Sequence, residues 1–252
     1  MKKNPSLLVI ATLALFLSCN KLDHWWDFVK DGKASKALRL DEMQHKGRIY
    51  EFFYHNDNML DSIVAREVLS KYTYVIFRHG KRLDSVSLIQ DGSTVSTNGN
   101  IQYDQKGRIT GYTYFLHAFP APPTHYSITY DNKGNIRTIA KSFLGNSEVD
   151  TLIFNGDNNL VHWDRSFDDL NYNYDNHLNP LYYIDNLFVM FVEEQFFWEF
   201  VFSQHNSTRK TYESDNFQVN YQNTYDANGR LIKKWFVERS TPQDSLEFRY
   251  AN

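Results

Sequence analysis

Tyr103-Asp104-Gln105-Lys106-Gly107-Arg108-Ile109 is the stretch that decides the fold, because the chain repeats it. The copies are spaced roughly 25 residues apart, a period typical of repeat architectures. They begin at Tyr54, Phe77, Tyr103, Tyr130, Phe154, Tyr174 and Tyr225, and Lys46-Gly47-Arg48-Ile49 is interpreted as a partial first copy. Since the pattern spans most of the chain, one structural unit is expected to recur along it.

Each unit has the composition of a tight β-hairpin. The leading aromatic closes one strand, and the following Asp or Asn can bond its own backbone two residues later and start a turn. Gly, or sometimes Asn, supplies the positive φ angle that a tight hairpin needs. The trailing Ile or Leu then opens the return strand on its buried face. The unit therefore predicts a hairpin corner at Gly107, Gly134 and Gly229.

The segments between these corners alternate apolar and polar residues, as half-buried strands do. Looser loops are expected at the opposite ends of the hairpins, at Asp91-Gly92-Ser93, Ala121-Pro122-Pro123 and Gly145-Asn146-Ser147. The predicted fold is all-β: an antiparallel up-and-down meander of repeated hairpins, curled into a barrel-like or superhelical sheet. The aromatic content of 16% fits strand-rich structure.

Residues 181–202 break the pattern with an aromatic run that has no tight turn. Leu181, Ile184 and Phe188 lie at helical spacing, and Pro180 is suited to a first helical turn. One short helix near 181–192 is predicted, with strand returning from Phe196 to Phe202. The helix is expected to plug the interior of the curled sheet or to cap one end; the alternative is a partner-binding surface.

The first residues resemble an export signal. Lys2 and Lys3 precede an apolar run that is shorter than the ~20 residues needed to span a bilayer. The run ends in Ser18-Cys19, which resembles a bacterial lipobox, so Cys19 is predicted to be lipidated; the alternative is an ordinary cleaved signal. The predicted organisation is a signal peptide over 1–18, a tether over 19–36 and a single repeat β domain over 37–252. Outer-membrane residence through the lipid anchor is expected, because Asn20 rather than an aspartate follows the cysteine.

A barrel embedded in the membrane is an alternative interpretation of the same strands. Charges expected on the outward face argue against it, because a Lys or Arg facing lipid at mid-bilayer costs ~2–4 kcal/mol. The examples are Lys71, Arg78, Arg137 and Lys141. The net charge of −3 also argues against a nucleic-acid partner.

Motifs that carry chemistry do not stand out in the sequence. The nine histidines show no zinc-ligand spacing, and the only cysteine is Cys19, so no metal and no cofactor are predicted. The repeated turn aspartates are interpreted as turn caps, since their loops lack the ligand series of a calcium site. Carboxylate pairs occur at Asp168-Asp169, at Glu193-Glu194, and at Asp150 with Asp157. A hydrolase would need two of them to converge in a cleft.

Two family resemblances rest on these motifs. The Tyr-Asp-x-x-Gly-Arg-Ile unit resembles the YD repeats of large bacterial shell proteins, which contain many more repeats. The whole pattern resembles the Bacteroidetes lipoprotein family of unknown function 4595, whose members are described as having a porin-like fold. The shared features are the lipobox, the hairpins, Asn179-Pro180, the aromatic stretch and His205-Asn206-Ser207. The resemblance implies no established activity and no catalytic residues.

The leading functional hypothesis is therefore a non-catalytic envelope lipoprotein that binds a glycan or protein partner, or that has a structural role. Aromatic residues on a concave sheet could stack sugars or hold a peptide. The candidates are Trp163, Trp198, Trp235, Tyr112 and Tyr114. The alternative is a carbohydrate-active hydrolase whose site assembles only in three dimensions. Convergent carboxylates or histidines in a deep pocket would favour the hydrolase.

Overall fold

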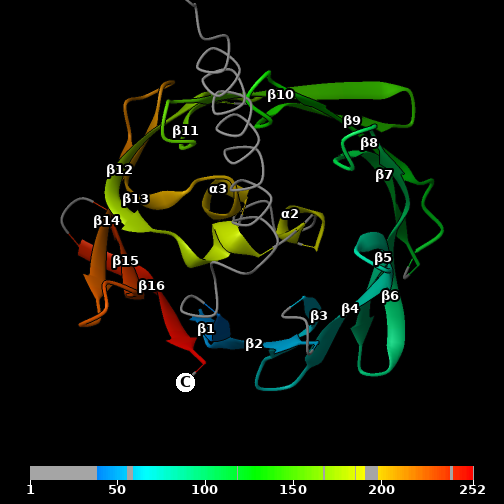
Figure 1. The fold of residues 1–252 in the computed structure, drawn as a ribbon, viewed down its shortest axis with the longest axis horizontal. Helices are drawn as coiled ribbons and strands as arrows, with labels where there is room; N and C mark the ends of the chain where they lie inside the picture. The colour runs from blue at the N-terminus through cyan, green and yellow to red at the C-terminus, as the bar shows by residue number, and fades with distance from the viewer. Residues whose placement is uncertain are drawn as a thin grey trace, which may run out of the picture.

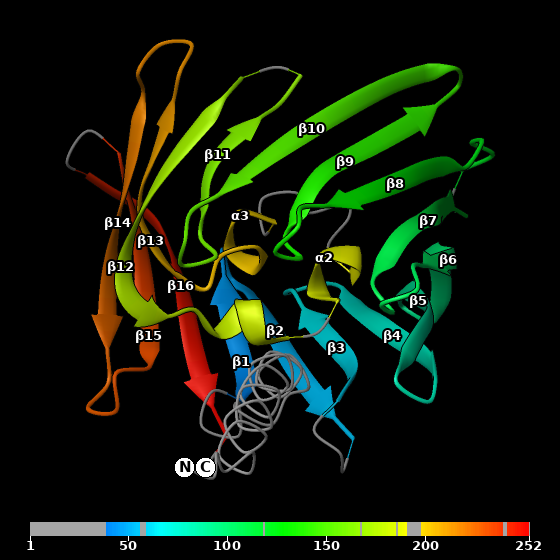
Figure 2. The ribbon, with the colours of Figure 1, turned by 45° about the horizontal axis from the view of Figure 1, so that its top comes forward.

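The strands close into an antiparallel barrel in which each strand pairs with its neighbours in sequence. A computed structural model describes residues 39–55, 59–117, 119–166, 168–184, 186–190, 198–238 and 241–251. Within these ranges sixteen strands are found, and β1 pairs with β16 to complete the ring. The ring is visible in Figure 1, and the slant of its strands in Figure 2. The predicted meander is confirmed, and the choice between a closed barrel and an open sheet is decided for the barrel.

Most strands have seven to ten residues. Their bounds are β1 Leu40–His45, β2 Arg48–Tyr54, β3 Leu60–Arg66, β4 Lys71–His79, β5 Arg82–Gln90, β6 Ser93–Tyr103, β7 Ile109–Leu116, β8 Thr124–Tyr130, β9 Ile136–Phe143, β10 Asn146–Phe154, β11 Leu160–Asp164, β12 Leu170–Leu178, β13 His205–Tyr212, β14 Gln218–Tyr225, β15 Leu231–Glu238 and β16 Thr241–Tyr250.

The repeated corners are type I turns followed by a residue with positive φ, which is the usual three-residue hairpin geometry. In the first quoted copy, Asp104 Oδ1 accepts the backbone N–H groups of Lys106 and Arg108, both at 2.9 Å. Gly107 follows with φ +78° and donates its N–H to the Asp104 carbonyl oxygen. In the copy that begins at Phe154, Asn158 takes the glycine position with φ +56°, as the sequence pattern allowed.

Several leading tyrosines join their own hairpin to the one before it, whereas Tyr225 donates to Asp175 instead. The Tyr130 hydroxyl donates to the Ile109 carbonyl oxygen at 2.7 Å, and Tyr103 donates in the same way to Leu83. The remaining bonds of this kind are Tyr54 to Leu40, Tyr174 to Leu160 and Tyr250 to Leu231. In these copies the aspartate accepts the backbone N–H groups of its own corner, and the tyrosine hydroxyl bonds the backbone of the preceding hairpin.

Two of the three loose loops predicted at the opposite ends of the hairpins are tight turns, whereas Ala121-Pro122-Pro123 lies in a longer connection between β7 and β8, as predicted. Asp91-Gly92 and Leu144-Gly145 have positive φ at both residues, so they are two-residue type I′ turns. Lys46-Gly47 has the same geometry and connects β1 to β2 at this end. The interpretation of Lys46–Ile49 as a partial copy of the repeat was therefore wrong. The type I′ geometry is favoured here because its twist matches that of the flanking strands.

The inner face of the barrel is apolar and the outer face carries paired charges. Cross-strand ion pairs on the outside join Glu51 to Arg66 at 2.6 Å and Lys233 to Glu247 at 2.5 Å. Lys71 and Arg137 are exposed, as expected. Arg78 and Lys141 differ from the prediction: Arg78 pairs with the buried Leu83, and Lys141 pairs with the buried Tyr126. Both side chains lie on the inner side of the barrel, because strand bulges interrupt the simple alternation of inward and outward residues.

The interior is filled by a segment that we call the plug, residues 180–203, of which 185 and 191–197 lie outside the described residues. It contains the 3-10 helix η2 Pro180–Tyr183 and the helices α2 Leu187–Met190 and α3 Trp198–Val201. Figures 1 and 2 show these helices inside the ring of strands. No described helix is long and apolar enough to cross a membrane.

The short helix predicted near 181–192 is confirmed, but the strand predicted to return by Phe202 is wrong. Its described part forms α3 instead. Apolar contacts bury Leu181, Leu187 and Phe200 against the wall, as the core interpretation of the segment required. A chain inside a closed barrel has no free strand to pair with, and a helix satisfies its own backbone groups without one.

The turn aspartate Asp226 makes stability depend on pH. The N–H of Arg230 and its guanidinium hold the pKa of Asp226 below its ordinary value. Because the folded pKa is lowered, this stabilisation is present above the unfolded value of ~3.9 and is lost as the pH falls through the folded pKa. We expect Asp226→Asn to lose less stability than the wild type between pH 7 and about pH 3, measured as the urea midpoint. The amide still shapes the corner, as Asn155 does in its own copy.

The matched control for this prediction is Asp84→Asn, a change at an exposed aspartate of β5. Its acid sensitivity should equal that of the wild type. Equal acid sensitivity in Asp226→Asn and the wild type would contradict the assignment.

Candidate functional site

A large cavity lies at the end of the barrel where the repeated Tyr-Asp corners are. Its volume is about 760 Å³, within the range of ~300–1,000 Å³ typical of small-molecule pockets. Two consecutive corners form one wall, and the plug forms the other. We call it the corner groove, lined by Lys106–Ile109, Tyr130, Asn132–Ile136, Phe154, Tyr182–Ile184, Asn186–Phe188, Val201 and Phe202.

Aromatic rings form much of the surface of the groove. Tyr182 and Tyr183 pack edge to face with ring centroids 5.3 Å apart, and both come from η2. Phe188 of α2 lies with its ring centroid 6.0 Å from that of Phe202. Burial raises the pKa of Tyr183 to about 12, with a further contribution from Tyr182. Both phenols therefore stay neutral at physiological pH and can donate hydrogen bonds.

Cations and amides complete the lining. The Arg108 guanidinium lies 4.2 Å from the Tyr130 ring centroid and bonds the Asp104 carboxylate through Nε at 2.8 Å. Lys106 and Lys133 are exposed at the rim. Asn132, Asn135 and Asn186 contribute amide groups. Among the described lining residues there is no aspartate, glutamate or histidine.

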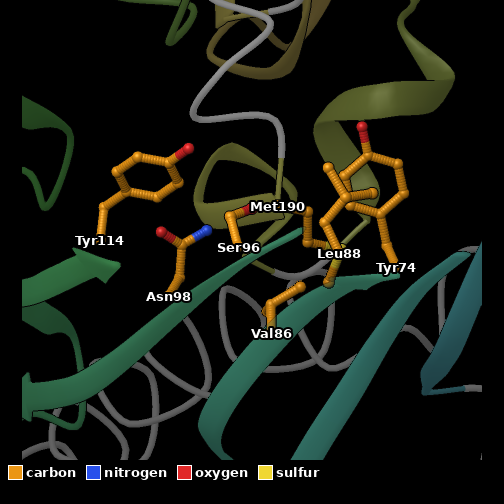
Figure 3. Close-up of a pocket in the computed structure, with 7 residues that line it drawn as sticks. All are labelled: Tyr74, Val86, Leu88, Ser96, Asn98, Tyr114 and Met190. Atoms are coloured by element: carbon orange, nitrogen blue, oxygen red, sulfur yellow. The ribbon is translucent and has the colours of Figure 1, made fainter. Parts of the chain in front are cut away.

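A second cavity lies between the plug and the wall strands and is shown in Figure 3. Its volume is about 10 Å³, which is room for about one water molecule. Tyr74, Val86, Leu88, Ser96, Asn98, Tyr114 and Met190 line it. Asn98 Nδ2 donates to the Val189 carbonyl oxygen at 2.7 Å, so this side chain ties α2 to β6. The small volume makes it a packing feature rather than a ligand site.

The structure does not gather the five predicted aromatic candidates into one site. Trp163 is buried in the core, with its ring centroid 6.4 Å from that of Phe202. Tyr112 is buried and stacks on Tyr126, whereas Trp235 faces outward under Lys233. Tyr114 lines the small cavity. The Trp198 side chain and Cys19 lie outside the described residues.

The carboxylate pairs do not converge on the groove either. Asp168 accepts the Ser214 N–H and hydroxyl in a loop, and Asp169 accepts the Arg165 N–H. Asp157 belongs to a corner, while Asp150 lies on the inner face of β10, where burial raises its pKa. Glu193 and Glu194 lie outside the described residues. Among the described residues, no group of three His, Cys, Asp or Glu side chains is placed to hold a metal ion.

A solved structure shares this fold. A porin-like protein from Bacteroides uniformis superposes with a TM-score of 0.59 at 12% sequence identity, covering 84% of this chain and 98% of that one. A porin-like protein from Bacteroides vulgatus gives a TM-score of 0.45 at 10% identity, covering 84% and 99%. No protein-family model and no curated protein matches the chain. The chain therefore has a porin-like fold, and membership of family 4595 stays a prediction.

The residues of the corner groove carry little local signal in the sequence, for a physical reason. Tyr182, Tyr183 and Phe188 were correctly placed on a plug, but nothing local shows which corners the plug faces. Lys106 and Lys133 were treated only as turn residues. A signal was present in the repeat itself, because lysine occupies the same turn position in just these two of the well-formed copies.

Proposed function

We propose that the chain is a cell-envelope lipoprotein that binds a ligand, without transforming it, in the corner groove. The observation that carries the proposal is the groove itself. It has the volume of a ligand pocket and is lined by aromatic rings and amide groups from both walls, and this combination is typical of binding sites. Aromatic rings with polar tips can contact both the apolar C–H faces and the hydroxyls of sugars. A glycan is therefore the ligand class we favour.

Three observations support the envelope location. The first residues resemble a lipoprotein signal ending at Cys19, and the fold is shared with porin-like proteins of Bacteroides. Ion pairs such as Lys233–Glu247 on the outer face of the barrel favour water over lipid around it. The body is thus proposed to stand outside the bilayer, attached by acyl chains. Those chains contribute about 0.8 kcal/mol per buried methylene.

The lipid anchor has a direct test. We expect the wild type expressed in a Bacteroides host to incorporate labelled palmitate and to fractionate with outer membranes. Cys19→Ser should lose both properties because the acylated sulfur is missing. Labelling that persists in Cys19→Ser would contradict the anchor, and Ser18→Ala serves as a control that retains the cysteine.

The proposed binding site is tested by removing one aromatic side chain that lines the groove. We expect Tyr183→Ala to weaken glycan binding about tenfold, which corresponds to ~1.4 kcal/mol of lost contact. The measurement is calorimetric titration with glycans first selected on an array. Phe53→Ala is the matched control, because Phe53 is an exposed aromatic on the outer face of β2, away from the groove. A folded wild type that binds no glycan would contradict the proposal.

A hydrolase remains a second candidate because of one observation. Asp150 has a raised pKa on the inner face of β10, and Glu148 lies two residues away on the same face. A carboxylate with a raised pKa is a typical general acid. The same titrations distinguish binding from hydrolysis if the glycan is recovered afterwards and its chain length is measured. Intact glycan supports binding alone, whereas shortened products support hydrolysis.

A further inference from the structure

We propose that the corner groove selects anionic oligosaccharides and that Lys106 and Lys133 recognise their charge. This inference rests on the proposed glycan-binding function and names the class of glycan. Both lysines line the groove, and they come from consecutive corners, between β6 and β7 and between β8 and β9. They therefore present two cations along one rim, next to the aromatic wall formed by the plug.

The repeat shows that these lysines are not needed for the corners themselves. Each occupies the second residue after the turn-forming Asp, where only the backbone N–H is used, at 2.9 Å from the carboxylate. Asp157 and Asn228 occupy the same position in other copies and make the same backbone bond at 3.0 and 2.9 Å. The turn thus accepts an acid, an amide or a lysine. Lysine is found at the two corners that line the groove.

Nearby carboxylates leave both ammonium groups available. Asp104 is engaged by Arg108, and the Asp131 carboxylate accepts the N–H groups of Lys133 and Asn135 together with the Asn135 amide. No ion pair from Lys106 or Lys133 occurs within the described part of the chain. Exposed cations without partners at the edge of an aromatic pocket attract an anionic ligand group.

The fold favours a glycan over the other anionic polymers. An extended peptide is commonly held by adding a strand to a free sheet edge, and a closed barrel offers no such edge. Nucleic acid is held mainly by extended basic surfaces, and this chain has a net charge of −3. Aromatic rings, amides and two cations in one pocket suit a short sugar chain that carries carboxylates.

The test compares two ligands that differ only in charge. The mature protein is titrated calorimetrically with an oligogalacturonate and with its methyl-esterified form, at low ionic strength and again at about 0.5 M salt. We expect the acid to bind about tenfold more tightly at low ionic strength and this preference to shrink at high salt. Lys106→Gln with Lys133→Gln should remove most of the preference while binding of the neutral ester is retained. Each exposed contact is expected to contribute about threefold.

Lys71→Gln is the matched control, because Lys71 is an exposed lysine at the opposite end of the barrel. The inference is overturned if acid and ester bind equally, or if the double variant keeps the preference; in either case glycan binding itself still stands. If neither glycan binds, the proposed function fails together with the inference. Tighter binding of an oligoglutamate than of either glycan would also overturn it, in favour of an acidic protein partner.

Discussion

Asn179→Ala is expected to lower the free energy of unfolding by about 3–5 kcal/mol, a large share of the ~5–15 kcal/mol of a typical domain. Asn179 is buried where the plug leaves β12. Its Oδ1 accepts the Leu181 N–H at 3.1 Å, and its Nδ2 donates to the carbonyl oxygens of Phe200 and of Ser203, the latter at 2.9 Å. Alanine leaves these three backbone groups without this partner in a site closed to water, and each loss costs about 1–3 kcal/mol.

Urea denaturation followed by tryptophan fluorescence measures this loss. Asn220→Ala is the matched control, since Asn220 is an exposed asparagine of β14, and its change should stay within about 0.5 kcal/mol. Because the plug forms one wall of the corner groove, Asn179→Ala should also weaken ligand binding. An Asn179→Ala protein as stable as the control would show that the plug is held mainly by apolar packing.

The same polar network explains why the plug starts and ends where it does. The Ser203 hydroxyl donates to the Tyr174 hydroxyl at 2.7 Å and accepts the Leu160 N–H at 3.1 Å. Tyr174 in turn donates to the Leu160 carbonyl oxygen. Tyr174 begins a degenerate copy of the repeat. It still makes the tyrosine hydrogen bond to the preceding hairpin, although no hairpin follows it. The chain enters the barrel where the corner is missing, instead of turning back directly.

The corners could be predicted from sequence because their determinants are local. Within one stretch of five residues, Gly229 and Arg230 both donate hydrogen bonds to Asp226, and these bonds do not depend on the rest of the chain. Closure of the barrel has no such local signal. It depends on β1 pairing with β16, where Leu40 meets Tyr250 from the other end of the chain, and on the Ala251 N–H bonding the Arg39 carbonyl oxygen.

The groove was beyond prediction for the same reason. Its walls combine two corners with a plug that lies several tens of residues later in sequence. The surroundings of a single aromatic residue are also hard to predict from local sequence. A tryptophan such as Trp163 has the same local pattern whether it faces a ligand or the core, and only the register with Leu152 and Leu170 places it in the core.

Two strand glycines on neighbouring strands should respond to alanine with opposite signs. A Cβ on Gly111 of β7 would lie 2.9 Å from the Tyr126 carbonyl oxygen, which is backbone of β8 and cannot turn aside. The strands would have to separate locally, and such overpacking costs about 1–3 kcal/mol. We therefore expect Gly111→Ala to lower the free energy of unfolding by that amount in urea denaturation.

Gly99 of β6 is the matched comparison, because it also lies within a strand and neither glycine has a positive φ. A Cβ there would meet nothing closer than 3.9 Å, from the Phe115 and Thr97 side chains. Alanine restricts the unfolded chain at no steric cost, so Gly99→Ala should be neutral or stabilise the protein by up to about 1 kcal/mol. Equal losses at both positions would contradict the steric explanation, because only Gly111 lies in close contact with a neighbouring backbone. The contrast in sign therefore tests whether these two strands approach as closely as the barrel requires.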